Sequence, residues 1–225
     1  MIQKSFLLIL GFTLSAHASD NIFDSSLPQE TKIQIQKDLN FMYSLEGQKQ
    51  TTFHQKIFGP LSGKSYKKYF EDHIWSIHFG DCGGNAIACA STRYDKKITL
   101  TENYIKFSHP QIARLMVLFH EARHTEEENG HWSHDVCPNP FLDKTGREIL
   151  SIWSGSPLAG EPACDATAFG SYGSSIILLK NIAQFCANCS DKVKMDADIY
   201  AMDQLIRIPR ADIKKSMIQD FNENK

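Results

Sequence analysis

The sequence predicts a helix-dominant α+β fold with a small sheet. Two observations support this class: alternation of apolar and polar residues is confined to short stretches, while apolar residues at helical spacing fill much of the chain. Along the chain the patterns run as one helix, then the strands, then several helices. That order is typical of α+β proteins.

The first 18 residues have the features of an export signal. Lys4 precedes an apolar run at 6–14, and an Ala-His-Ala triplet predicts cleavage after Ala18. The run is too short to span a bilayer, so we expect a secreted or periplasmic protein without stable membrane insertion. Residues 19–225 are predicted to form a single domain, in which 19–70 are a helical N-terminal part or a pro-segment.

The first half of the mature chain contains one helix and two strand candidates. Apolar residues at helical spacing predict a helix from about 28 to 45, whereas the polar, glycine-rich segment 47–70 supports no assignment. Alternation over 74–79 predicts a strand, and 97–101 is a second strand candidate.

The helix that follows is the best defined of the chain. Ser108 and Gln111 have the spacing of a capping box, and Pro110 suits a first helical turn. An apolar stripe continues from there, and Gly130 is a natural stop. Residues 131–160 are rich in proline and glycine and are expected to be loops.

Three more helices are expected in the last third of the chain. Pro162 is predicted to start a helix that runs to about residue 185. Residues 192–208 and 210–221 have helical patterns, and Pro209 separates them.

The even number of cysteines in an exported chain indicates disulfides. They are Cys82, Cys89, Cys137, Cys164, Cys186 and Cys189. The first two flank a Gly-Gly-Asn turn signal and are placed to pair across it. The last two can form a short-loop disulfide, a redox pair or half of a zinc site, which leaves Cys137 and Cys164 to pair by elimination.

The segment His120-Glu121-Ala122-Arg123-His124 has the spacing of a catalytic zinc motif. Histidines four residues apart present both rings from one face of a helix, so both can bind one ion. Zinc accepts imidazole nitrogens and lowers the pKa of a bound water, and the adjacent carboxylate can take its proton. Glu121 is therefore the predicted general base.

A strand, a helix carrying this motif and a glycine turn together resemble the zincin superfamily of zinc metallopeptidases. The resemblance covers about residues 96–135 and implies a zincin-like domain with His120 and His124 as Zn²⁺ ligands. It also implies that residues 98–101 are the strand with which an extended substrate pairs.

Four residues are candidates for the third zinc ligand. His131 and His134 follow the motif, although neither has the spacing of the metzincin branch. Glu161, followed four residues on by an aspartate, has the gluzincin spacing, but Pro162 disfavours a helix there. Asp165 can bind zinc as in the aspzincin branch, or orient a ligand histidine.

Other polar residues near the motif have expected roles as well. Tyr172, predicted to share a helical face with Asp165, is a candidate for stabilising the oxyanion. Arg123 is expected to be an ion-pair donor. The acidic run 126–128 is expected to be solvated, because the end of a helix disfavours negative charge.

The leading functional prediction is an exported zinc metallopeptidase that acts on a peptide or protein, cell-wall peptides included. The alternatives are a cell-wall peptide amidase and a non-catalytic zinc-binding protein stapled by disulfides. A variant resembling archaemetzincins would bind a second zinc through its cysteine pair at 186–189. A formal net charge of −2 gives no support for nucleic-acid binding.

Overall fold

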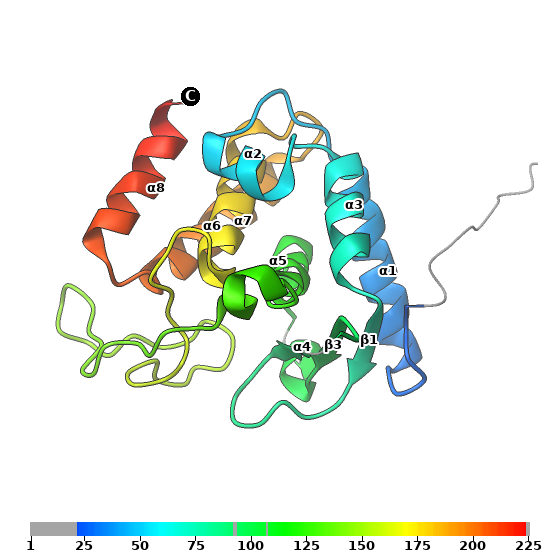
Figure 1. Cartoon of the computed structure of the whole chain (residues 1–225), viewed down its shortest axis with the longest axis horizontal. Coiled ribbons are helices and arrows are strands. Elements are labelled where there is room, and N and C mark those ends of the chain that lie inside the picture. Colours follow the sequence, from blue (N-terminus) through cyan, green and yellow to red (C-terminus); the bar gives the residue numbers. More distant parts are fainter. Residues whose placement is uncertain (1–21, 92–93, 107, 224–225) are drawn as a thin grey trace, which may run out of the picture.

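The computed structural model describes residues 22–91, 94–106 and 108–223 of the chain. Helices dominate this part and accompany a three-stranded sheet, which confirms the predicted α+β class (Figure 1). The predicted signal and its cleavage site lie outside the described residues. The helices are α1 (Gln29–Tyr43), α2 (Thr52–Phe58), α3 (Gly63–His73), α4 (Glu102–Lys106), α5 (Gln111–Arg123), the short 3-10 helix η1 (Glu127–Trp132), α6 (Ser171–Phe185), α7 (Asp191–Ile206) and α8 (Ala211–Glu223).

The sheet consists of β1 (Ser76–Phe79), β2 (Ala88–Ala90) and β3 (Lys97–Leu100), in the order β1-β3-β2. β3 is parallel to β1 and antiparallel to β2. The outer side of β1 is partly covered, because Phe23 forms a bridge with Ile77. β2 is therefore the open edge of the sheet.

Helix α5 is the centre of the fold. Eleven of its thirteen residues are buried, which leaves hardly any of its surface to solvent. It contacts α1 and α3 on one side, α6 and α7 on another, and the sheet on a third (Figure 1). A helix that is apolar on nearly all sides belongs in the core of a protein. The motif residues at its C-terminal end are thus held in the buried centre of the molecule.

Two helices lie where the sequence supported no assignment. The side chain of Thr51 accepts a hydrogen bond from the backbone N–H of His54 at the start of α2, and Ser62 caps α3 through Ser65 in the same way. Such caps satisfy backbone donors that a helix start leaves unpaired. α2 packs against α6, and α3 packs against α5.

The predicted boundaries of α5 were wrong at both ends. Its N-cap is Pro110 and no side chain caps it, so the capping box expected from Ser108 does not form. The helix ends at Arg123, and η1, which contains Gly130, follows after a short turn. Gly130 has φ +62° and the next two residues also have positive φ, a conformation that cannot continue a right-handed helix.

Helix α6 begins nine residues later than predicted, whereas α7 and α8 lie close to the predicted ranges. Residues 162–170 are not helical because Cys164 pairs with Asp135 in a β-bridge and is joined to Cys137. These contacts hold Cys164 in a bridge, and the residues around it form bends and turns instead of a helix.

All six cysteines form disulfides: Cys82–Cys89, Cys137–Cys164 and Cys186–Cys189. This result corrects both the redox and the zinc interpretations of the last pair, because neither sulfur is free to bind a metal or to act as a thiolate. In the described ranges, no helix is both long and apolar enough to cross a bilayer.

A buried ion pair ties α1 to α5. The Asp38 carboxylate is 1% exposed and accepts two hydrogen bonds from the Arg114 guanidinium, at 2.7 and 2.8 Å. Gln111 donates a third hydrogen bond to it, at 3.1 Å. A carboxylate this deeply buried is tolerated only because its partner and its hydrogen bonds are all in place.

We expect Asp38→Ala to lower the free energy of unfolding by about 3–5 kcal/mol, because it leaves the Arg114 charge buried without its partner. Urea denaturation of the mature chain measures the change. The matched control is Asp72→Ala, which removes an exposed carboxylate from its pair with Lys68 and should cost less than about 0.5 kcal/mol. A loss at Asp38 no larger than that of the control would contradict the assignment.

Candidate metal site

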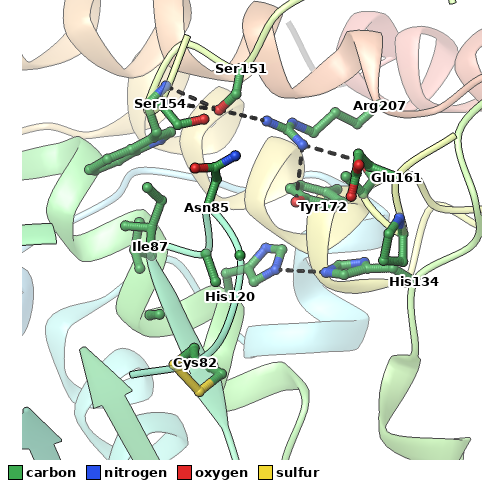
Figure 2. Close-up of a pocket in the computed structure, with 18 of the residues that line it drawn as sticks. Cys82, Asn85, Ile87, His120, His134, Ser151, Ser154, Glu161, Tyr172 and Arg207 are labelled. Carbon is green, nitrogen blue, oxygen red and sulfur yellow. Dashed lines mark hydrogen bonds between the residues drawn. A yellow bond between two sulfur atoms is a disulfide. The ribbon is translucent and has the colours of Figure 1, made fainter. Parts of the chain in front are cut away.

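A cleft of about 820 Å³ opens over the C-terminal half of α5. One wall is the segment that leads into β2, where Asn85 and Ile87 lie, and the opposite wall holds Tyr172 and Arg207 (Figure 2). His120 lies at the floor between them. The cleft is thus assembled from the edge strand and the segment before it, the central helix, the loop before α6, the start of α6 and the C-terminal end of α7.

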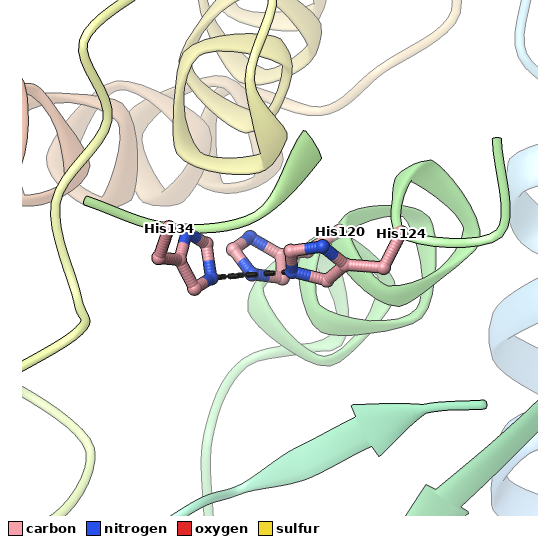
Figure 3. Close-up of side chains that lie close together, drawn as sticks. All are labelled: His120, His124 and His134. Carbon is pink, nitrogen blue, oxygen red and sulfur yellow. Dashed lines mark hydrogen bonds between the residues drawn. The ribbon is translucent and has the colours of Figure 1, made fainter. Parts of the chain in front are cut away.

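Three histidines converge at this floor (Figure 3). The Nε2 atom of His134 lies 3.2 Å from Nε2 of His120 and 3.2 Å from Nε2 of His124. One ligand atom from each ring lies within 4.8 Å of the others. The three side chains can therefore hold one metal ion.

The donor set is compatible with Zn²⁺, one of the metals that imidazole nitrogens bind. Nitrogen ligands bind Zn²⁺ at about 2.0–2.1 Å with tetrahedral angles, which places two such nitrogens about 3.3 Å apart. The two separations of 3.2 Å agree with that value. Three imidazole nitrogens that face one another direct their lone pairs at a single point, an arrangement that a shared cation stabilises.

The second ring nitrogen of each histidine also has a partner. His134 donates from Nδ1 to Oδ1 of Asp165 at 2.9 Å, and His124 donates from Nδ1 to the carbonyl of His131 at 2.8 Å. Ser175 Oγ lies 3.4 Å from Nδ1 of His120. Such partners fix the tautomer that leaves Nε2 free to bind a metal.

Asp165 is itself held by the start of α6. Its Oδ2 accepts hydrogen bonds from the backbone N–H groups of Tyr172 and Gly173, at 2.7 and 3.1 Å. The carboxylate is 2% exposed. Residue 170 must be glycine here, because a Cβ at Gly170 would lie 2.3 Å from the same oxygen.

Burial sets the protonation of the motif residues. It lowers the pKa of His124 to about 4 and that of His120 well below its usual range, and neighbouring histidines add to both shifts. Both rings are neutral near pH 7, the form that binds metals. Burial raises the pKa of Glu121 to about 8, against a backbone hydrogen bond from Ala90.

The structure separates the four candidates for the third ligand. His134 joins the cluster, whereas His131 turns its ring away and hydrogen-bonds through Nδ1 to the carbonyl of His124. Asp165 reaches the far nitrogen of His134 and takes the orienting position. Glu161 lies in the cleft wall with its side chain exposed. Among the described residues, neither acidic candidate joins the histidine cluster.

Tyr172 lies beside the cluster but not on a helical face shared with Asp165, because Asp165 precedes α6. Its ring stacks on His134 with centroids 4.4 Å apart, and its hydroxyl accepts a hydrogen bond from Arg207 at 3.1 Å. Burial raises the pKa of Tyr172 to about 12. The hydroxyl thus keeps its proton at neutral pH.

The loop after the motif is held by Glu126, which was expected to be solvated. Its carboxylate instead forms an ion pair with Arg123, as that arginine was expected to do, and accepts hydrogen bonds from Tyr69 and Trp132. The guanidinium of Arg123 also lies 4.5 Å from the Trp132 ring centre. These contacts hold the left-handed turn whose carbonyl at His131 orients His124.

The strand beside the motif is β2 rather than 98–101, which corrects the expected substrate strand. β3 pairs with a strand on each side, so its backbone groups are used. β2 lines the cleft along its whole length. Three residues are too few to show alternation, so the sequence did not indicate this strand.

Comparison of the chain with protein-family models, with curated proteins and with solved structures finds no match. The assignment of the site therefore depends on its geometry.

We expect His134→Ala to lose stoichiometric zinc binding, because only two of the three nitrogens remain. Asp165→Asn should weaken zinc affinity by about 10–100-fold through the changed partner of His134. Titration calorimetry and metal analysis of purified protein measure both. His131→Ala is the matched control, since it keeps the carbonyl that orients His124, and it should bind zinc as the wild type does. This ligand set would be refuted if His131→Ala lost zinc while His134→Ala kept it.

Proposed function

We propose that this chain is an exported zinc-dependent hydrolase, and most specifically a metallopeptidase. The observation that carries the proposal is the position of Glu121. It follows the first ligand histidine, is 6% exposed, and lines the same cleft as the three-histidine cluster. A carboxylate beside an open metal site is the arrangement needed to activate water for attack on a carbonyl.

In this proposal His120, His124 and His134 hold the ion. When bound, Zn²⁺ supplies Lewis acidity and lowers the pKa of water toward about 7. A bound cation would favour the ionised form of Glu121 over the protonated form that burial favours. The ionised carboxylate would then take the proton of the attacking water and pass it to the leaving amine. The Ala90 N–H holds the carboxylate at the cleft for both transfers.

Tyr172 has the role of an oxyanion donor in this scheme. Its hydroxyl accepts from Arg207 and keeps its own proton, so it can donate to a developing negative charge. Its ring lies against the rings of His134 and His120, with centroids 4.4 and 4.5 Å apart. A substrate carbonyl bound near the cluster would lie within reach of this side chain.

The edge strand favours a peptide as substrate. Ile87 and Ser91 form backbone hydrogen bonds with β3, and by the alternation of an antiparallel pair Cys89 does the same. The N–H and C=O of Ala88 therefore point to the open edge, as does the C=O of Ala90, whose N–H is directed to Glu121. An extended peptide can add to this edge by main-chain hydrogen bonds.

Export is supported by the three disulfides, since such bonds persist in oxidising compartments. The N-terminal pattern that predicts a cleavable signal agrees with that location. The relation to zincins remains a proposal based on the motif and on the edge strand beside it.

We expect Glu121→Gln to bind zinc as the wild type does but to lower kcat/KM by about 10²–10⁴-fold, because the general base is lost. Hydrolysis of a degenerate heptapeptide pool, followed by mass spectrometry, measures the rate. The control, Glu128→Gln, removes an exposed carboxylate outside the cleft and should leave the rate unchanged. If the zinc-loaded wild type and Glu121→Gln are equally inactive on peptides and on cell-wall fragments, the result would instead favour a non-catalytic zinc protein.

We expect Ala88→Pro to raise KM about 5-fold or more with little change in zinc content. Proline removes an N–H that points away from β3, so it spares the sheet but deletes one hydrogen bond to an added peptide strand, worth about 1 kcal/mol. Steady-state kinetics on one cleaved peptide measure the effect. Ala88→Ser keeps the N–H and should retain the wild-type KM, and an equal rise in both variants would argue against strand pairing.

A further inference from the structure

Arg207 is a buried cation in the wall of the cleft. It follows the last residue of α7 and is 4% exposed, yet it lines the cleft together with Tyr172 and Ser151 (Figure 2). The mechanism described above uses Arg207 only as a partner of Tyr172. A guanidinium in this position can also contact what enters the cleft.

The hydrogen-bond partners of Arg207 are all neutral. Its guanidinium donates to the Ala163 carbonyl at 3.3 Å, to the Tyr172 hydroxyl at 3.1 Å and to Ser151 Oγ at 3.5 Å. It also lies 4.6 Å from the centre of the Tyr172 ring. Because a guanidinium has five N–H groups, these contacts leave donors for a ligand.

Within the described ranges, Arg207 takes part in none of the ion pairs closer than 4 Å. The nearby Asp203 carboxylate, which accepts a hydrogen bond from Gln204, attracts Arg207 electrostatically but is not among these ion pairs. Glu161, in the same wall, is exposed and therefore solvated. A buried charge without an ion partner is costly, and an anion from solution would offset that cost.

We propose that Arg207 binds a carboxylate of the substrate and makes the cleft selective for acidic peptides. This inference rests on the proposed peptidase function for its substrate class. The planar fork of a guanidinium matches the two oxygens of a carboxylate, which a neutral amide does not. The carboxylate can belong to the peptide C-terminus or to an Asp or Glu side chain.

The geometry places this carboxylate close to the bond that is cleaved. One aromatic ring, that of Tyr172, separates the guanidinium from the ligand ring of His134. The two centroid distances together, 4.6 and 4.4 Å, are shorter than three residues of extended chain at about 3.3–3.6 Å each. The acidic group thus lies within about three residues of the reacting carbonyl.

Two pairs of peptide pools test the proposal on the zinc-loaded mature protein. One pair has the same degenerate sequences with a free or an amidated C-terminus, and the other has Glu or Gln at a fixed internal position with both ends blocked. We expect kcat/KM to be about 10–30-fold higher for the charged member of at least one pair. The pair that responds identifies the source of the carboxylate.

Arg207→Gln should bring that ratio close to one, and Arg207→Lys should keep part of it, because a point charge lacks the fork. Arg147→Gln removes an exposed arginine far from the cleft lining and should keep the full ratio. Zinc content and thermal unfolding report whether each variant folds. If Arg207→Gln does not fold, a partial loss of the wild-type ratio in Arg207→Lys supports the proposal.

A binding measurement separates failure of this inference from failure of the peptidase proposal. Fluorescently labelled members of the same pools are titrated into zinc-loaded Glu121→Gln, with and without Arg207→Gln. Tighter binding of the charged member that depends on Arg207, without any cleavage by the wild type, supports the carboxylate site and refutes the peptidase. A wild-type ratio near one in both cleavage and binding, or a ratio that Arg207→Gln leaves unchanged, overturns the carboxylate site.

Discussion

The Asp165 carboxylate is the contact on which the rest of the site depends. One oxygen accepts a hydrogen bond from Nδ1 of His134, and the other accepts two hydrogen bonds from backbone N–H groups at the start of α6. A negative charge is favoured at that position by the helix dipole as well. The same helix brings Ser171 and Ser175 to the rings of the other two histidines, at 3.2 and 3.4 Å. The orientation of all three rings is thus linked to one helix start.

The sequence predicts the part of this site that lies on one helix, but it does not single out the distant residues that complete the site. His120, Glu121 and His124 are placed by helical spacing alone, so a pattern suffices to find them. His134 and Asp165 lie 31 residues apart, and no periodicity relates them. Their neighbours do carry a signal: Cys137 follows one closely, Cys164 directly precedes the other, and the two are bonded. Because the Cys137–Cys164 pairing was predicted only by elimination, it could not be used to predict that His134 and Asp165 lie together.

The helices and strands also differ in how much of their position follows from their own sequence pattern. The long helices have enough turns for an apolar stripe to be recognised. The ranges of α1, α7 and α8 were predicted closely, whereas a turn and η1 replace the predicted end of α5 and a loop replaces the predicted start of α6. α2 and β2 are short and are stabilised by their neighbours rather than by their own pattern. α3 has 11 residues, and Tyr66, Tyr69 and Phe70 lie at helical spacing on its buried face. The capping residues Thr51 and Ser62 are the local sequence signals for the starts of α2 and α3.

The edge strand and the proposed base are parts of one unit. Ala90 directs its N–H to the Glu121 carboxylate, while the neighbouring Cys89 hydrogen-bonds β3 and is joined to Cys82 in the loop of the cleft wall. A peptide added to β2 would pair with the backbone next to the group that holds the base. Any shift of this strand would therefore move the substrate and the carboxylate together. In the proposed peptidase, this coupling would let a strand of three residues, anchored by a disulfide, place a peptide carbonyl near Glu121.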